Sequence, residues 1–194
     1  MNVVLRHGLE PAQRRQAARL YWRAFGGKLG RVIGPEPKAL AYIERVIDPR
    51  HVIAASDDGG RVLGVIGFRT RDGSFVAGTR ADLVAVYGSF GAFWRRLALS
   101  VLAQDLPIEM VSVDGLAVAE RARGLGLGAA LMRALCDEAA RQGYAGVRLD
   151  VVGENLRARA LYDRLGFAVT GRADRWLTAV MFGYRTVLAM ERRW

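Results

Sequence analysis

The stretch Glu120–Leu131 reads ERARGLGLGAAL and places Gly124, Gly126 and Gly128 at the start of a helical sequence. Each glycine lowers helix stability by about 1 kcal/mol relative to alanine, so the glycines need another reason to be there. Glycines between a strand and a helix leave backbone N–H groups bare at the positive end of the helix dipole, where phosphate binds. The stretch therefore predicts a phosphate-bearing ligand that comes very close to the backbone.

The flanking residues predict a strand, a helix and a second strand around this loop. Ile108–Val118 has the composition of a strand, and the apolar residues from Leu127 onward form one helical stripe that ends at Gly143. Ala145–Val152 is the next expected strand, which makes the segment a βαβ unit with parallel strands. Asn155 then fits the N-cap of a further helix.

Shorter elements are expected on both sides of this unit. The turn Asp57–Gly60 indicates a β-hairpin, and Gly26-Gly27 indicates the end of the first helix. Ser74–Tyr87 matches neither a helix nor a strand clearly. No repeat or linker divides the chain, so we expect a single domain of residues 1–194 with mixed α/β structure. The other expected strands are Asn2–Arg6, His51–Ala55, Arg61–Arg69, Phe167–Thr170 and Tyr184–Glu191, and the other expected helices are Pro11–Phe25, Lys38–Ile47 and Ser89–Gln104.

The composition is that of an ordinary globular chain, with 52% hydrophobic and 25% charged residues. No charge-free apolar stretch reaches the roughly 18 residues of a membrane span. The net charge of +10 permits nucleic-acid binding, but 27 of the 29 basic residues are arginines spread along the chain without a long run. An anionic small ligand or a solvated surface is therefore favoured over nucleic acid. The lone cysteine, Cys136, cannot form an internal disulfide, and this fits a cytoplasmic location.

Two known phosphate-binding motifs can be compared with the glycines. The Walker A motif is excluded because no Lys-Ser/Thr pair follows them. The dinucleotide fingerprint fits better, since Gly124, Gly126 and Ala129 match it and Asp150 follows about 20 residues later. However, the charged segment Ala119–Arg123 separates the first glycine from its strand, Asp150 lies inside a strand, and few residues remain for such a domain. A dinucleotide site is the less favoured alternative.

Two motifs together resemble the GNAT acetyltransferase superfamily. Arg123, Gly126 and Gly128 match its signature of Arg or Gln, two residues, Gly, one residue, then Gly or Ala. NLRARALYDRLGF (Asn155–Phe167) matches the second signature, N-x-x-A-x-x-L-Y-x-x-x-G-F, at every position. The two motifs and their strands cover Met110–Phe167. The resemblance implies the acyl-CoA N-acyltransferase fold, a central and mostly antiparallel sheet with splayed parallel strands at the cofactor site, flanked by helices.

The resemblance also implies acetyl-CoA as co-substrate. The backbone amides of Arg123–Ala129 would wrap the pyrophosphate, and a Cβ at the glycines would hold the phosphates away. The strand before the loop would pair with the pantetheine arm, with one N–H polarising the thioester carbonyl. Asn155 would contact the arm as well as cap its helix. The implied cofactor-binding residues are Leu116, Ala117, Val118, Arg123, Gly124, Leu125, Gly126, Leu127, Gly128, Ala129, Asn155 and Tyr162.

Two residues are expected to take part in the chemistry. Tyr162 matches the family tyrosine that protonates the departing thiolate, although a lone tyrosine on an apolar face is also a normal core residue. The acceptor amine must lose a proton before it attacks. Asp150 lies where the similar ribosomal-protein alanine N-acetyltransferases carry a glutamate base, but it is one methylene shorter, so a bridging water is the alternative to direct abstraction. Asp114 and Glu109, on or before the preceding strand, are rival bases.

The expected function is direct transfer of an acetyl group to an amine, either a small molecule or a peptide or protein amine. A coenzyme-binding regulatory module without turnover is the alternative. Ser89–Gln104 is apolar nearly all round apart from its arginines, which predicts a homodimer contact or a wall of the acceptor pocket. Cys136 is expected in the core, against an acetyl-cysteine intermediate. His7 and His51 have no visible partner ligands, so no metal site is expected.

Overall fold

The computed structural model describes residues 2–100, 109–174, 183 and 186–194. The helices in these ranges are α1 (Arg14–Ile33), α2 (Glu36–Val46), α3 (Arg80–Ser100), α4 (Leu127–Arg141) and α5 (Leu156–Arg164), with 3₁₀ turns at Pro11–Gln13, Pro49–His51 and Glu120–Ala122. The strands are β1 (Val3–His7), β2 (Val52–Asp57), β3 (Val62–Thr70), β4 (Gly73–Ser74), β5 (Met110–Val118), β6 (Gly146–Val152), β7 (Ala168–Asp174) and β8 (Thr186–Arg193).

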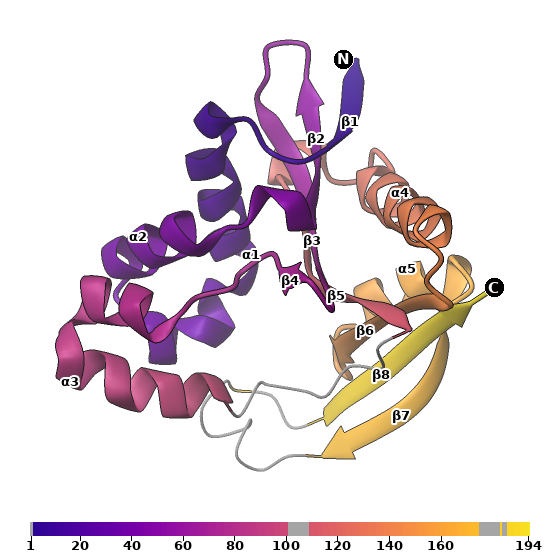
Figure 1. The fold of residues 1–194 in the computed structure, drawn as a ribbon. Coiled ribbons are helices and arrows are strands. Elements are labelled where there is room, and N and C mark those ends of the chain that lie inside the picture. The colour runs from indigo at the N-terminus through magenta and orange to yellow at the C-terminus, as the bar shows by residue number, and fades with distance from the viewer. Residues whose placement is uncertain (1, 101–108, 175–182, 184–185) are drawn as a thin grey trace.

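These strands form one sheet in the order β1-β2-β3-β5-β6-β8-β7, with β4 paired to the end of β3. Every neighbouring pair is antiparallel except β5 and β6, which are parallel and are joined through α4 (Figure 1). The fold class expected from the sequence is confirmed, including its βαβ unit.

The parallel pair separates soon after it forms. Its ladder joins Met110–Ser112 to Gly146–Arg148. Beyond these residues, β5 continues along β3 and β6 continues along β8. The splay predicted by the resemblance is present, and it opens the sheet between β5 and β6.

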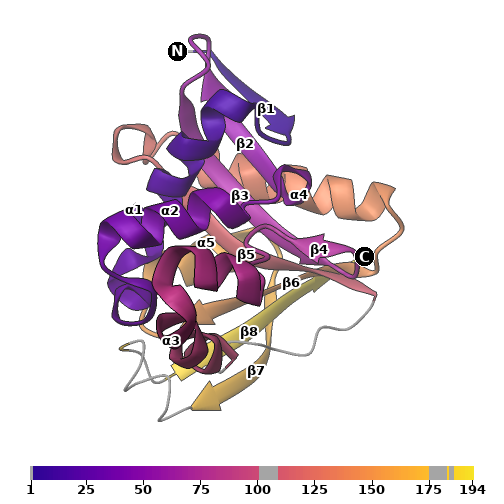
Figure 2. The same cartoon turned by 60° about the vertical axis from the view of Figure 1, so that its left-hand side comes forward.

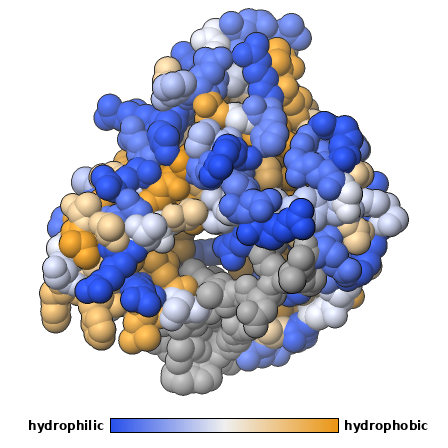
Figure 3. Space-filling view, viewed as in Figure 1, coloured by the Kyte–Doolittle hydropathy of each residue, from blue (hydrophilic) through white to orange (hydrophobic). Residues whose placement is uncertain are grey.

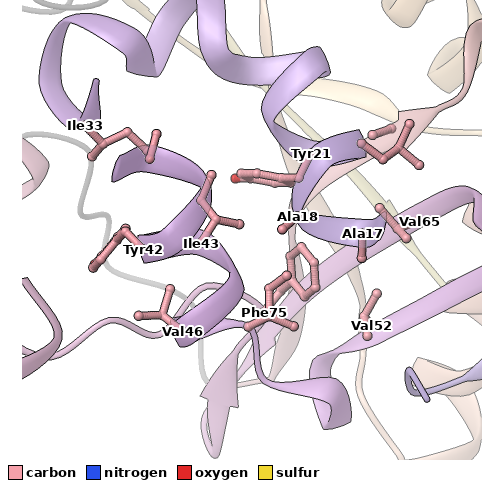
Figure 4. Packing of buried hydrophobic residues seen from close by; sticks show 14 of the residues in the cluster. Ala17, Ala18, Tyr21, Ile33, Tyr42, Ile43, Val46, Val52, Val65 and Phe75 are labelled. Atoms are coloured by element: carbon pink, nitrogen blue, oxygen red, sulfur yellow. The ribbon is translucent and has the colours of Figure 1, made fainter. Parts of the chain in front are cut away.

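Helices cover both faces of the sheet (Figures 1 and 2). On one face α1 packs against β3 and β5, and α2 and α3 pack against α1. Tyr21, Ile43 and Phe75 are among the buried side chains of this first core (Figure 4). On the other face, α4 packs over the strands, with Leu131 and Leu135 in a second core.

Helix α1 runs past Gly26-Gly27, where the sequence predicted its end. Val32 and Ile33 in its last turn are only 2% and 3% exposed, and burying them outweighs the helix cost of the glycines. A side chain at Gly26 would also meet the ring of Trp22, since a Cβ there would lie 2.9 Å from it. The helix ends at Ile33, and the amide of the following residue, Gly34, still donates to the carbonyl of Gly30 at 2.9 Å.

The predicted hairpin between β2 and β3 forms as expected. The Asp57 carboxylate accepts hydrogen bonds from the amides of Gly59 at 3.1 Å and Arg61 at 2.9 Å. The Gly60 amide donates to the Asp57 carbonyl at 2.9 Å, which closes the turn. The two closing strands also form as β7 and β8; positions 184–185 of the second prediction lie outside the described residues.

The region Ser74–Tyr87, left unassigned by its pattern, contains the end of β4 and the first part of α3. At Gly88 the backbone leaves the helical region, with φ at +71°, so α3 consists of two helical pieces. The second piece matches the helix predicted from Ser89, and positions 101–104 of that prediction lie outside the described residues. Tyr87 donates to the carbonyl of Ile33 and thereby ties the first piece to the end of α1.

The second piece of α3 carries apolar side chains on the surface. Phe90, Phe93 and Leu97 are 88%, 74% and 67% exposed and follow one another at helical spacing. Figure 3 shows hydrophobic side chains gathered on the surface where Figure 1 draws α3. Among the described helices, none is long and apolar enough to cross a bilayer.

Candidate functional site

A cleft of about 1530 Å³ runs through the opening between β5 and β6. On one side of the sheet it is lined by the loop before α4 and by α4 and α5; we call this the α4 side. On the other side it is lined by α1 and by side chains such as Arg69, Asp114 and Asp150; we call this the α1 side. The splay therefore connects two compartments that an unbroken sheet would separate.

The loop before α4 presents unbonded backbone amides to the cleft. The first helical bond runs from the Ala130 amide to the Gly126 carbonyl at 3.0 Å, and the amides from Gly124 to Ala129 donate to no described residue. They lie at the positive end of a 15-residue helix. Such an arrangement binds anions, phosphate above all.

The glycines are required by the backbone conformation of this loop. Gly124 and Gly126 have φ values of +83° and +75°, in the left-handed region that favours glycine. A Cβ at either position would meet no protein atom within 4 Å. Gly128 differs, because its Cβ would contact Leu161 at 3.5 Å. Gly124 and Gly126 therefore face open space, which a side chain would fill.

Most of the predicted loop residues lie where the sequence placed them, and two details differ. Arg123 lines the cleft, but its amide donates to the Glu120 carbonyl at 3.1 Å, so the unbonded amides begin at Gly124. Leu125 does not line the cleft, and the residue is 59% exposed. The other predicted positions that line the cleft are Gly124, Gly126, Leu127, Gly128 and Ala129.

Strand β5 contributes main-chain groups to the opening. Val65 faces Ala117 across the β3–β5 ladder, and the Ala119 amide donates to the Leu63 carbonyl at 2.8 Å. Bonded pairs alternate along an antiparallel ladder, so the backbone of Ala117 is used by β3. The N–H and C=O groups of Leu116 and Val118 point the other way, into the opening between β5 and β6.

Two predicted residues come from α5 and its cap. Tyr162 lines the cleft and is 8% exposed. Burial raises the pKa of its hydroxyl to about 12, so the group is protonated at neutral pH. Asn155 also lines the cleft, and its side-chain oxygen accepts from the Ala158 amide at 3.1 Å. Asn155 therefore caps α5, and its amide nitrogen is the part that could serve a ligand.

The three acids proposed as bases have different surroundings. Asp150 lines the cleft with its side chain 29% exposed, and its nearest cation is Arg148, with 3.9 Å between Oδ1 and Nη2. Asp114 also lines the cleft, but its oxygens lie 3.0 Å from Arg69 and 3.1 Å from the Phe75 amide. Burial raises the pKa of Asp114, against the opposing effect of Arg69. Glu109 is not in the cleft and pairs with Arg193 at 3.3 Å.

A model of the acetyltransferase (GNAT) family matches residues 14–167 of the sequence. The chain belongs to this family. Its members transfer acetyl groups, with acetyl-CoA as the usual donor and amines as acceptors. The unbonded amides, the splayed strands and Tyr162 all lie within the matched residues.

Solved structures show the same fold. A GCN5-related N-acetyltransferase from Kribbella flavida is 20% identical, covers 99% of this chain and 98% of its own, and has a TM-score of 0.65. An N-acetyltransferase from Staphylococcus aureus Mu50 is 14% identical over 97% and 100%, with a TM-score of 0.69. The ribosomal-protein-S18-alanine N-acetyltransferase from Escherichia coli is 17% identical over 99% and 94%, with a TM-score of 0.60. No curated protein matches the sequence.

The α1 side of this acetyltransferase carries residues that the sequence did not single out. Arg69, Ser112 and Arg148 are direct cross-strand neighbours on β3, β5 and β6, and all three line the cleft. Tyr21 of α1 lines the same side, and burial raises the pKa of its hydroxyl. These residues come together through sheet register, and no short motif marks them.

The remaining predictions concern Cys136 and metal ions. Cys136 lies in the second core, is 3% exposed and does not line the cleft. Burial raises the pKa of its thiol, which disfavours the nucleophilic thiolate. Within the described part of the chain, no group of three or more His, Cys, Asp or Glu side chains is arranged to hold a metal ion.

Proposed function

We propose that this protein is an N-acetyltransferase that transfers the acetyl group of acetyl-CoA directly to an amine. The observation that carries the proposal is the cleft itself. It joins a phosphate-binding loop on the α4 side to an accessible carboxylate, Asp150, on the α1 side, through the opening between β5 and β6. Donor and acceptor can thus approach one reaction centre from opposite faces of the sheet.

The coenzyme would bind on the α4 side. The amides from Gly124 to Ala129 would hold its pyrophosphate, helped by the dipole of α4 and by Arg133 and Arg157, which also line the cleft. The pantetheine arm carries amide groups of its own. It would lie in the opening and bond to the free main-chain groups of Leu116 and Val118, as a strand would.

The transfer follows from this placement. The acceptor ammonium gives a proton to Asp150, directly or through water, and the free amine attacks the thioester carbonyl. Negative charge develops on the carbonyl oxygen, where an N–H group of β5 can stabilise it. When the C–S bond breaks, the hydroxyl of Tyr162 gives its proton to the departing sulfur. The nitrogen loses its second proton as the amide forms, and a proton returned through solvent restores the hydroxyl. The transfer needs no acetyl-enzyme intermediate. The burial of Cys136 away from the cleft agrees with such direct transfer.

A turnover screen tests the proposal. The purified protein is mixed with acetyl-CoA and a panel of amines and peptides, release of coenzyme A is followed, and products are identified by mass spectrometry. We expect an N-acetylated product. Binding of acetyl-CoA without turnover on any amine would instead indicate a regulatory module. Binding of NADH in place of coenzyme A would indicate a dinucleotide site. An affinity for DNA or RNA that falls steeply with salt concentration would indicate a nucleic-acid-binding protein.

A further inference from the structure

Two arginine–aspartate pairs lie side by side on the α1 side of the cleft. Arg69 on β3 pairs with Asp114 on β5, and Arg148 on β6 lies near Asp150, two residues along the same strand. Ser112 lies between the two arginines in the ladder. Side chains two residues apart on a strand share a face, so all five residues border one polar floor.

The two arginines differ in how close their guanidinium groups lie to a carboxylate. The guanidinium of Arg69 lies 3.0 Å from Asp114. Arg148 is more buried, with its side chain 22% exposed, yet its nearest carboxylates are 3.9 Å away at Asp150 and 4.0 Å away at Glu191. It makes no hydrogen bond to any described residue. Its charge is balanced by these two carboxylates, but no oxygen of a described residue accepts a hydrogen bond from its N–H groups, which can therefore donate to a bound carboxylate.

We propose that the acceptor is a free amino acid, whose carboxylate binds Arg148 while its ammonium group lies at Asp150. This inference rests on the proposed function. The two charges of the protein and the two charges of such a zwitterion are complementary. Arg148 and Asp150 are 3.9 Å apart at their nearest atoms, and an amino acid likewise carries its ammonium and carboxylate groups close together, on the same Cα atom. The contact would also place the amine beside the residue that takes its proton.

The charge of the surroundings favours the same acceptor. Arg23, Lys28 and Arg172 line the cleft together with Arg69 and Arg148, whereas the acids there are Asp114 and Asp150. Asp114 is paired with Arg69, and Arg172 is paired with Asp174 at 3.2 Å, so the excess positive charge comes from the other cations. A polyamine would therefore meet a positive field, and the amine of a peptide N-terminus would bring no carboxylate for Arg148.

Matched acceptors test the inference. Each of the standard amino acids is compared with its carboxamide and with the amine that lacks the carboxyl group, using wild type, Arg148→Gln, Arg148→Lys and Arg71→Gln. Arg71 does not line the cleft and has a 69% exposed side chain, so Arg71→Gln removes the same charge outside the floor. Binding of acetyl-CoA to each variant confirms that it is folded.

Wild type should prefer at least one amino acid over its carboxamide by about 10- to 100-fold in kcat/KM, as expected for one charge-assisted pair. Arg148→Gln should abolish most of that preference, mainly through KM. Arg148→Lys should restore part of it, because lysine keeps the charge without the planar fork. Arg71→Gln should behave as wild type.

Equal use of amino acids and carboxamides by wild type would overturn the inference and leave the transferase proposal intact. An Arg148→Gln variant that loses activity equally on both members of a pair would also overturn it. If no amine is acetylated, the proposed function fails, and calorimetry decides the site separately. Amino-acid binding to the coenzyme-loaded protein that is lost in Arg148→Gln would support the site, and absence of binding to wild type would refute it.

Discussion

Asp114 lies 3.0 Å from the guanidinium of Arg69 and accepts a hydrogen bond from the Phe75 amide at 3.1 Å, so both of its carboxylate oxygens are engaged. Asp114 is also the extra residue of a bulge in β5, where the register with β3 shifts between Gly67 and Phe68. Bulges redirect side chains, and here the bulge turns Asp114 toward Arg69. These contacts suit a residue that positions Arg69 better than one that takes a proton from the substrate.

The first prediction separates Asp114 from Asp150. Asp150→Asn should lower turnover most at low pH, where the amine is largely protonated, and raising the pH should recover part of the loss. Asp114→Asn keeps an oxygen for the Phe75 amide and loses the ion pair, so it should raise KM for the acceptor without changing the shape of the pH profile. Profiles of kcat/KM for the two variants check this. A pH profile altered only in Asp114→Asn would show that the base is Asp114.

The second prediction concerns the loop before α4. Gly126→Val should abolish acetyl-CoA binding, and with it the rise in melting temperature that a native-state ligand gives. Gly143→Val is the matched control, because Gly143 also has a positive φ, +79°, and open space around its Cβ. Both variants therefore carry similar backbone strain, but only Gly126 lies at the unbonded amides. Unchanged affinity in a folded Gly126→Val protein would contradict the assigned role of the glycines.

The third prediction concerns Tyr162 in the reaction. Tyr162→Phe keeps the ring packed in the second core and removes only the hydroxyl. Affinity for acetyl-CoA should stay nearly unchanged while kcat falls by about 10²-fold, as expected when a general acid is lost. Steady-state kinetics and calorimetry of the same preparation measure the two quantities. Full kcat in Tyr162→Phe would mean that the tyrosine is a packing residue and that the thiolate leaves without its help.

The fourth prediction is that the Tyr162 hydroxyl makes the folded protein less stable at alkaline pH. Burial raises the pKa of Tyr162 from 10.0 to about 12 in the folded protein. Between pH 10 and 12 the hydroxyl is therefore ionised in the unfolded chain but still protonated in the folded protein. Ionisation favours the unfolded chain, so the free energy of unfolding falls as the pH rises from 10 toward 12. The difference in free energy of unfolding between wild type and Tyr162→Phe should therefore shift in favour of the variant across this range. Denaturant titrations below and within the range measure it; a constant difference would refute the burial effect.

The fifth prediction concerns the exposed stripe of Phe90, Phe93 and Leu97 on α3. Large exposed apolar patches are typical of interaction surfaces, and we expect this one to be a contact between two copies of the chain. Light scattering should give a dimer, and Phe90→Glu combined with Phe93→Glu should give a monomer with its coenzyme binding intact. A wild-type protein that is monomeric at working concentration would rule out the dimer.

The strand and helix order around the glycine loop could be predicted because each element is marked locally, by glycines, by an N-cap at Asn155 and by apolar periodicity. The end of α1 could not, since the burial of Val32 and Ile33 is a tertiary effect that overrides the local signal of Gly26-Gly27. The floor of Arg69 and Arg148 was missed for a related reason. Their strands are far apart in the sequence, and only the register of the sheet makes them neighbours.

The short ladder between β5 and β6 has a consequence for hydrogen exchange at the backbone amides of β5. Among the strands that the structure describes, none pairs with the amides of Leu116 and Val118 across the opening, so these amides should exchange with deuterium quickly in the free protein. A pantetheine arm that bonds to them would act as the missing strand of the sheet. Slowed exchange at these two amides on addition of coenzyme A would then show that the bound coenzyme joins the part of the sheet that ends at β5 and the part that begins at β6 into one cooperative unit.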